Sequence, residues 1–349
     1  MELDLTEEQR QLVDAFAGLF SKQAGSEQVR AAEPLGFDKA LWDQLLEMGV
    51  LAMGIAEADG GWGATPLDLA LIAEQVGRFA APVPFVETVA AARLLARLGA
   101  GELLGAALDG QKLITLALHP VLDGRAALVP AGAVATDVIA LRLDEQRGSD
   151  LVLVPAEGVR TVVENLGSMP VADIAVGDDV TVIASGDAAL AAYDAALTDV
   201  EFLTAAALVG MGARSLEVAL EYVKERKAWG TPIGAFQSVA HRLADAHTGI
   251  EGARLLAYEA AWAQTDEVSR ASELAAFAFG FASEAAREAT YRALHYHGGY
   301  GFMNEYDLQL YWRRARGWAG VHLEPKLAYA RGERFRLARL DGARTSGES

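Results

Sequence analysis

The sequence has no cysteine among its 349 residues. Disulfide bonds, thiolate catalysis and zinc sites built on thiolates are therefore excluded. The sequence also lacks an uninterrupted apolar stretch of the roughly 18 to 20 residues that span a bilayer, so we expect no membrane span. A secretory leader starts with basic residues before an apolar block, whereas Met1 is followed here by Glu2, Asp4, Glu7 and Glu8. We therefore expect a cytoplasmic protein.

Positive charge is scarce as well, because 30 basic residues stand against 48 acidic ones and give a formal net charge of -18. A surface of this sign repels a polyphosphate backbone, so nucleic acid is not an expected partner. The simplest role of the excess acid is a solvated surface that keeps the protein soluble. With 52% hydrophobic residues the chain can build substantial cores, which argues against global disorder.

Helical periodicity dominates roughly the first 100 residues. Leu12, Phe16 and Phe20 repeat every four residues and would lie along one stripe of a helix. The pattern breaks at residues 59–63, which are rich in glycine, and at residues 80–84, where each proline disfavours helix in the residue before it. Several helices in succession, joined by loops, are therefore expected here.

Short β-branched runs replace the helical pattern in the middle of the chain, and helical periodicity then returns. The runs are separated by Gly, Pro and Asp and predict strands, which include residues 114–116, 138–139, 151–154 and 180–183. Because the strands form one group between two groups of helices, we predict segregated layers and not alternating βαβ units. The predicted fold is α+β, mainly α, with an N-terminal helical domain (residues 1–109), a small central β domain (110–188) and a C-terminal helical bundle (189–349).

Two segments of the C-terminal third combine residue types that suit a dinucleotide. A flavin dinucleotide carries a diphosphate, which calls for a guanidinium and for backbone amides at close range. Arg226, at a predicted helix end, supplies the guanidinium, and Gly298 and Gly299 let the main chain approach a ligand closely. Trp229 offers an aromatic plane, and the amide of Gln237 both donates and accepts. Each residue alone also has a structural explanation, as a tight turn, a surface charge or a core aromatic.

In their order and spacing these segments resemble the acyl-CoA dehydrogenase family. Residues 225–237, followed by 241–245, resemble the point in that family where a long helix ends, the chain turns and the next helix begins. Residues 297–302, running into 304–308 and 313–315, resemble its flavin-contacting glycine turn. The N-terminal half agrees more loosely, through residues 37–38, 41–42, 45, 49, 60–63, 74 and 77–78.

The resemblance implies a flavoprotein oxidoreductase that binds FAD and dehydrogenates an acyl-CoA substrate between its α and β carbons. Such an enzyme takes part in fatty-acid or side-chain β-oxidation and passes its electrons to an electron-transfer acceptor protein. In the family, Arg226, Trp229 and Gln237 would reach a flavin held mainly by a neighbouring subunit, and Gly298 and Gly299 would contribute across an interface. We therefore expect a homo- or hetero-oligomer, a dimer or a tetramer, in which assembly is part of FAD binding.

The catalytic base departs from the family pattern. Dehydrogenation needs a carboxylate to remove the α proton while the flavin accepts a hydride from the adjacent carbon. Relatives place this glutamate in one of two positions, which the motifs align with His322 and Val200. Neither is a carboxylate, although Glu324 and Glu201 lie close in sequence. Glu201 is one helical step, about 100°, from the required face and stands where relatives usually carry an arginine. The candidate bases are therefore His322, since imidazole in general can act as a base near neutral pH, and Glu324 in a predicted loop.

The β region departs from the family as well. Relatives line the flavin ring with a Thr-Glu-Pro segment and a Gly-Ser-Asp turn, of which residues 118–120 (Leu-His-Pro) are the only recognisable trace. His295 stands where the family usually has a glutamine, which makes it a further candidate cofactor contact. The three histidines His295, His297 and His322 are too loosely spaced for a metal site and lack a nearby acid pair, so no metal is expected.

Two functions stay open on these residues. The first is an FAD-dependent acyl-CoA dehydrogenase with its own reaction centre and with His322 or Glu324 as the base. The second is a non-catalytic partner subunit that completes the FAD site of a catalytically intact paralogue, as the missing base and the reduced β region suggest. The acyl group is open in both, because straight-chain, branched, aromatic and steroid side-chain thioesters all suit the motifs.

Overall fold

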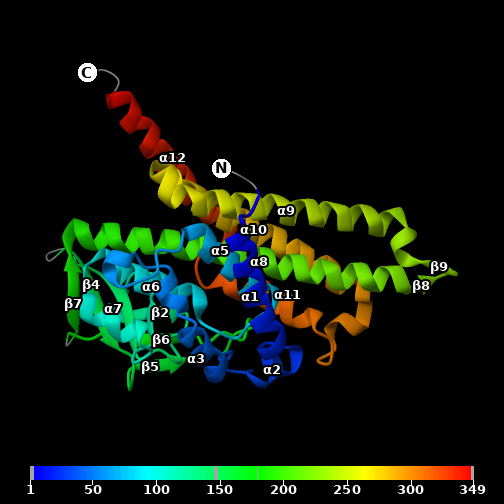
Figure 1. The fold of residues 1–349 in the computed structure, drawn as a ribbon, viewed down its shortest axis with the longest axis horizontal. Coiled ribbons are helices and arrows are strands. Elements are labelled where there is room, and N and C mark those ends of the chain that lie inside the picture. Colours follow the sequence, from blue (N-terminus) through cyan, green and yellow to red (C-terminus); the bar gives the residue numbers. More distant parts are fainter. Residues whose placement is uncertain (1–3, 145–147, 179, 347–349) are drawn as a thin grey trace. The chain divides into compact units, whose positions relative to one another are not determined.

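Figure 1 shows the fold in a computed structural model, which describes residues 4–144, 148–178 and 180–346. Helices come first, strands follow between residues 114 and 185, and helices return up to residue 346. This order confirms the predicted α+β class, mainly helical, with its strands grouped in the middle of the chain. The domain boundaries at residues 109 and 188 stay a prediction.

The chain divides into two compact units, and each is described by itself. The sheet unit comprises residues 29–69 and 82–200, and the bundle unit comprises residues 1–28, 70–81 and 201–349. Three helices have residues in both units, namely α2 (Ser26–Ala31), α5 (Pro66–Arg78) and α8 (Gly186–Glu225).

The strands of the sheet unit form two small sheets. One has the order β1-β3-β4-β7, with β1 parallel to β3 and the other pairs antiparallel, and the second is antiparallel with the order β2-β6-β5. Their bounds are Ile114–Leu116 (β1), Arg125–Val129 (β2), Asp137–Asp144 (β3), Gly148–Pro155 (β4), Arg160–Val162 (β5), Ala172–Ala175 (β6) and Thr181–Ser185 (β7). Alternate residues of both sheets point into one buried core, which includes Val138, Val152, Val129 and Ile174. The β-branched runs singled out in the sequence overlap β1, β3, β4 and β7, so those strand predictions are confirmed.

The remaining helices of the sheet unit are short and mostly apolar on their buried faces. They are α3 (Lys39–Glu47), α4 (Val50–Met53), the 3-10 turn η1 (Glu57–Asp59), α6 (Phe85–Arg97) and α7 (Gly101–Leu108). The glycine-rich stretch at 59–63 and the proline-rich stretch at 80–84 fall between helices, as expected. Helix α6 packs against β1 and α7.

The bundle unit is built around α10 (Val268–His297), which packs against α9 (Gln237–Asp266), α11 (Leu308–Gly320) and α12 (Pro325–Ser346). Helices α9 and α10 are joined by the single residue Glu267 and run side by side in opposite directions (Figure 1). The remaining elements of this unit are α1 (Glu7–Gln23), the short strands β8 (Lys227–Ala228) and β9 (Thr231–Pro232), and the 3-10 turns η2 (Ile233–Ala235) and η3 (Gly298–Phe302). The predicted stripe on α1 is confirmed at Phe16 and Phe20, which are both buried.

Helix α8 is long and apolar enough to cross a membrane by length and composition. Its most apolar window has a mean hydropathy of 1.4, but 94% of that window is buried inside the protein. In a globular protein, a helix that is apolar all round lies in the core, which is the simplest account of α8.

Helices α5 and α8 touch through two glycines in the bundle unit. A Cβ at Gly77 would lie 1.7 Å from the carbonyl oxygen of Ala207, and a Cβ at Gly210 would lie 1.9 Å from the carbonyl oxygen of Glu74. No real Cβ approaches a backbone oxygen so closely, so either side chain would force the two helices apart. The contact also positions Glu74, whose carboxylate accepts from Arg254 Nε at 3.1 Å and from the Tyr258 hydroxyl at 2.7 Å.

Replacing either glycine of this contact, as Gly77→Ala or Gly210→Ala, should lower the free energy of unfolding by about 3 kcal/mol or more, because the backbones must separate. Gly18→Ala is the matched control, since Gly18 lies in α1 and its Cβ would meet nothing within 4 Å. That control should be neutral, or stabilising by up to about 1 kcal/mol. Urea unfolding measures the free energy of unfolding of each variant. An equal loss of this free energy in all three variants would contradict the close contact.

Glu87 is the charged exception on the buried face of α6. Among the described residues, each of the other buried carboxylates has a cationic partner: Glu74, Asp137, Asp199, Glu201 and Glu273 pair with Arg254, Lys112, Arg93, Arg331 and Arg339. Glu87 has no such partner in the part of the chain that the structure describes. Its burial raises the pKa of the carboxyl to about 7, although its own backbone N–H opposes the shift.

The pKa of Glu87 predicts a stability that falls with rising pH. The unfolded chain releases this proton near the ordinary pKa of 4.5, whereas the folded chain holds it up to about 7. The free energy of unfolding should therefore decrease between these two pH values, by about 3 kcal/mol in total. Glu87→Gln should remove this loss, while Glu102→Gln on the exposed start of α7 should retain it. Chemical unfolding at about pH 5 and about pH 8 measures the slope, and equal slopes in wild type and Glu87→Gln would refute the assignment.

Candidate functional site

A two-residue hairpin follows the end of α8. Strands β8 and β9 pair Lys227 with Pro232 and Ala228 with Thr231, which leaves Trp229 and Gly230 as the turn. Both turn residues have positive φ, 49° at Trp229 and 80° at Gly230, as tight hairpin turns require. A bulky residue rarely adopts this conformation, and the Trp229 side chain stands 94% exposed. Its one ring contact is the edge of Phe236, with the ring centroids 6.1 Å apart.

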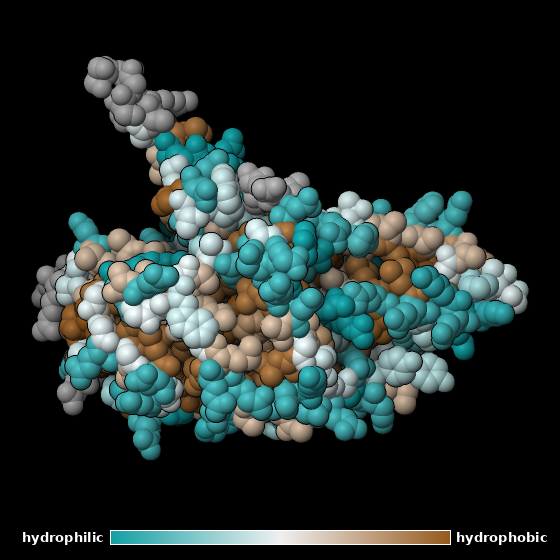
Figure 2. Space-filling model, viewed as in Figure 1, coloured by the Kyte–Doolittle hydropathy of each residue, from teal (hydrophilic) through white to brown (hydrophobic). Residues whose placement is uncertain are grey.

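Arg226 and Gln237 lie on either side of this hairpin, and both are exposed. Arg226 directly follows α8, where its backbone N–H donates to the carbonyl of Tyr222 at 2.8 Å. Gln237 is the first residue of α9. An apolar groove of about 460 Å³ lies beside them, lined from α8 and α9 by Leu220, Val223, Leu243 and neighbouring residues. Figure 2 shows apolar surface between α8 and α9 close to the hairpin end.

The glycine turn follows α10 and forms η3. Gly298 has φ 60°, so a left-handed backbone accounts for this glycine. Gly299 has no such constraint, and a Cβ at either position would meet nothing within 4 Å. Gly301 differs, because its Cβ would lie 2.7 Å from the carbonyl oxygen of Leu294. No contact within the described chain therefore requires glycine at 299, which leaves its backbone open to another molecule.

The ends of α8 and α10 meet at the same end of the bundle unit. The rings of Tyr222 and His297 stack with centroids 4.0 Å apart, four residues before Arg226 and one before Gly298. The Tyr296 hydroxyl donates to the carbonyl of Ser238 at 3.4 Å, which brings the start of α9 to the same place. Burial lowers the pKa of His297, and its Nδ1 lies 2.8 Å from the carbonyl of Ala293, so this histidine is a neutral structural residue that donates to the backbone.

The structure therefore gathers the sequence-predicted cofactor contacts on one exposed end of the bundle unit. Arg226, Trp229, Gln237, Gly298 and Gly299 come from segments around residues 226–237 and 298–299, which the two contacts above hold together. His295 is exposed in the last turn of α10, with its ring 5.8 Å from that of Tyr291. A guanidinium, an aromatic plane and an open glycine backbone suit a dinucleotide diphosphate, so these residues fit part of an FAD site.

The two positions that the motifs align with the catalytic base, Val200 and His322, are buried, unlike the exposed candidate cofactor contacts. Val200 is buried in α8, and the next residue, Glu201, is fully buried. One oxygen of Glu201, Oε1, lies 3.2 Å from Nε2 of His322 and 3.0 Å from Nε of Arg331. His322 is 6% exposed, and its ring packs edge-to-face with that of Phe279, with the ring centroids 5.2 Å apart. The histidine that stands at one base position is thus bound to the carboxylate beside the other.

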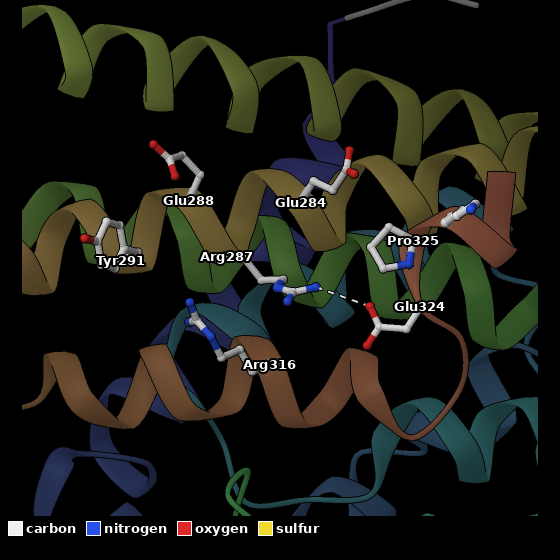
Figure 3. A pocket seen from close by; sticks show the side chains of 8 residues that line it. Glu284, Arg287, Glu288, Tyr291, Arg316, Glu324 and Pro325 are labelled. Carbon is white, nitrogen blue, oxygen red and sulfur yellow. Dashed lines mark ion pairs between the residues drawn. The ribbon is translucent and has the colours of Figure 1, made fainter.

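Glu324, the second candidate base, lies in a different environment. Its carbonyl accepts from the amides of Leu327 and Ala328, so it opens α12. Its side chain is 71% exposed and pairs with Arg287 at 3.5 Å in a surface groove (Figure 3). Glu324 and His322 therefore have different partners, and the structure does not pair them in one site.

Arg331 was not identified from the sequence, because it comes nine residues after His322 with no recognisable motif between them. The one available signal was the apolar stretch around Glu201, since a buried acid requires a cation from elsewhere in the fold. Residues 118–120, the trace of the flavin-lining segment, follow β1. In the part of the chain that the structure describes, no group of three His, Asp or Glu residues could hold a metal ion.

Known proteins match this chain along most of its length. The family models for the N-terminal and C-terminal domains of acyl-CoA dehydrogenase match residues 6–108 and 192–319. The acyl-CoA dehydrogenase IpdE2 of Mycolicibacterium smegmatis is 32% identical over 326 residues, which covers 92% of this chain and 96% of that relative.

Two solved structures share both fold and detectable sequence similarity. A chain of the ChsE4-ChsE5 complex from Mycobacterium tuberculosis matches with a TM-score of 0.83 and 25% identity, and the match covers 100% of this chain and 100% of that chain. The Tcur3481-Tcur3483 steroid ACAD has a TM-score of 0.86 and 27% identity, with 97% of this chain and 99% of that chain covered. Fold, family models and full-length similarity agree: the chain belongs to the acyl-CoA dehydrogenase family.

Proposed function

We propose that this chain is a non-catalytic subunit of a cytoplasmic, heteromeric acyl-CoA dehydrogenase and that it completes the FAD site of a catalytically intact paralogue. The single observation that carries the proposal is the buried cluster of Glu201, His322 and Arg331. The cluster lies where the sequence motifs align the catalytic base of the family. The assembly would oxidise an acyl-CoA substrate and transfer the electrons to an acceptor protein.

The cluster is a poor proton acceptor for a substrate. A general base must reach the α proton within hydrogen-bond distance in a plausible substrate pose. Val200 has no titratable group, and His322 directs Nε2 at Glu201. Both carboxylate and imidazole are almost fully buried, at 0% and 3% side-chain exposure, so neither offers an open surface to a thioester. A carboxylate enclosed in this way serves to balance cations inside the bundle unit.

The exposed end of the bundle unit supports the second half of the proposal. When bound, FAD supplies the hydride acceptor of the reaction. This chain would hold its nucleotide part, with Arg226 on the diphosphate, the backbone of Gly298 and Gly299 at close range, and Trp229 against the partner's surface or the cofactor. A tryptophan that is 94% exposed on a strained turn gains from burial in an assembly, because large aromatic side chains dominate interface energetics.

The similarity to two-chain assemblies is consistent with a heteromer. ChsE4-ChsE5 is a complex of two differently named chains, and Tcur3481-Tcur3483 is again a pair. Because the second of these is a steroid ACAD, steroid-derived thioesters belong among the substrates to be assayed beside straight-chain, branched and aromatic ones.

Co-expression of this chain with its paralogue should give an assembly that contains flavin, whereas the chain purified alone should bind little. In the assembly, Arg226→Gln should weaken FAD binding by about tenfold or more, since a charge-assisted contact to phosphate is lost. Arg10→Gln on the exposed face of α1 is the matched control and should leave flavin content unchanged. Flavin absorbance per chain is the measurement. A chain that alone retains flavin and dehydrogenates an acyl-CoA would refute the proposal and favour the self-contained enzyme.

The double variant His322→Gln, Glu324→Gln separates the two functions directly. Glutamine at 322 keeps a donor toward Glu201, and the Glu324 pair with Arg287 is long and exposed, so the folded assembly should turn over at a rate within about twofold of wild type. Glu201→Ala should instead lower the free energy of unfolding by about 3 to 5 kcal/mol, because it removes the carboxylate from a buried ionic cluster. Steady-state kinetics on folded assemblies that showed loss of turnover in the double variant would assign the base to this chain.

A further inference from the structure

A groove of about 590 Å³ opens on the surface of the bundle unit, between α10, α11 and the first turn of α12. Its lining is almost entirely charged, and Figure 3 shows the side chains involved. They are Glu284, Arg287, Glu288 and Tyr291 from α10, Arg316 from α11, and Glu324, Pro325 and Lys326 from the start of α12. Arg287 precedes Gly298 by eleven residues, or about 16 Å along a helix, although Tyr291 at one edge of the groove lies next to the candidate flavin contact His295, with their ring centroids 5.8 Å apart.

Acids and bases are sorted within this groove. Glu284 and Glu288 point away from the gap between α10 and α11, whereas Arg287 and Arg316 reach into it (Figure 3). Both acids already have partners outside the gap. Glu284 accepts from the Tyr329 hydroxyl at 2.7 Å, and Glu288 accepts from Arg292 at 2.6 Å. Glu324 does reach toward Arg287 (Figure 3), but the two arginines outnumber it and leave the gap with a net positive charge in a protein whose net charge is -18.

Arg316 is the least compensated of these cations. Its guanidinium lies over the ring of Trp312, 4.2 Å from the ring centroid, and its Nη1 donates to the carbonyl of Trp312 at 3.4 Å. No carboxylate pairs with it among the residues that the structure describes. Burial, together with the nearby Arg287, lowers the pKa of Arg316, so its charged form is disfavoured at this position.

The other cations of the gap are also available to a ligand. Among the described residues, Arg287 forms an ion pair with Glu324 at 3.5 Å, and the Glu324 side chain is 71% exposed. Such exposed ion pairs contribute little to stability. Lys326 has no ion pair among the described residues. Two arginines that reach into the gap, with Lys326 also lining the groove, match a group that carries two negative charges better than a single carboxylate. Tyr291 also lines the groove, and its ring is 40% exposed although the Arg292 guanidinium lies 5.4 Å from the ring centroid; the exposed part of the ring can contact a base.

We propose that this groove is a second ligand site, which binds the phosphate end of a nucleotide between Arg316, Arg287 and Lys326 and places the base against Tyr291. Arg316 supplies the fixed bidentate donor, because its guanidinium is held flat on Trp312. Arg287 exchanges its long contact with Glu324 for the phosphate. The site does not depend on the function proposed above, since none of its residues belongs to the flavin-contact end or to the cluster around Glu201.

Calorimetric titration of the full chain tests the site, with ADP and inorganic pyrophosphate as probes at low ionic strength. Both should bind, and ADP should bind more tightly if Tyr291 stacks on the base. Arg316→Gln should weaken both by about tenfold or more, and Tyr291→Ala should weaken ADP alone. Arg336→Gln is the matched control, because Arg336 lies on α12 outside the groove and pairs with Glu333. This control should bind ADP as the wild type does.

Coenzyme A, titrated in parallel, distinguishes the source of the nucleotide. Binding tighter than that of ADP, and equally dependent on Arg316, would indicate the nucleotide end of the thioester, whereas equal binding would indicate a free nucleotide. The site is refuted if wild type binds no probe, or if Arg316→Gln binds as tightly as wild type. It is also refuted as a separate site if Arg316→Gln loses flavin from the assembly in parallel with ADP. Failure of the FAD proposal alone would leave these titrations unchanged.

Discussion

Two buried carboxylates on α8 require compensating positive charge from other elements of the fold. Asp199 and Glu201 flank Val200, and both are fully buried. A buried carboxylate stays ionised only when cations and hydrogen bonds compensate for its lost hydration, whereas an uncompensated one such as Glu87 has a raised pKa. Asp199 accordingly bonds Arg93 and Arg97 within the sheet unit, and Glu201 contacts His322 and Arg331 within the bundle unit. Both acids of this segment of α8 are therefore held in buried ionic contacts.

Charge compensation inside the protein contrasts with its absence at two places on the surface. At the hairpin end, Trp229 is almost fully exposed, and no contact among the described residues requires glycine at position 299. Arg226 is exposed beside them. In the groove beside α12, Arg316 pairs with no acid among the residues that the structure describes. Exposed groups of this kind, without a partner among the described residues, are where another molecule can complete the contacts.

Long, strongly periodic segments made the fold readable from the sequence. The four-residue repeat of Leu12, Phe16 and Phe20, and the β-branched runs in β1, β3, β4 and β7, correctly indicated element types because periodicity follows directly from backbone geometry. The candidate cofactor contacts around Arg226 and Gly298 could also be named from the sequence, because local motifs of helix end and glycine turn carry them, and their role in binding stays a prediction. The association of α5 with α8 through Gly77 and Gly210 had no local signature, since it depends on the approach of two backbones far apart in sequence.

The sequence by itself determined the family, the order of helices and strands, and the absence of a carboxylate at both aligned base positions, because each of these is written in residue identity and spacing. Only the tertiary structure decided how the remaining titratable groups are used. His322 and Glu324 are two residues apart, yet one lies in a buried ionic cluster and the other opens a helix at the surface. The difference arises from burial and from partners such as Arg331 and Arg287, which approach from distant segments, and burial is a property of packing that no local pattern encodes.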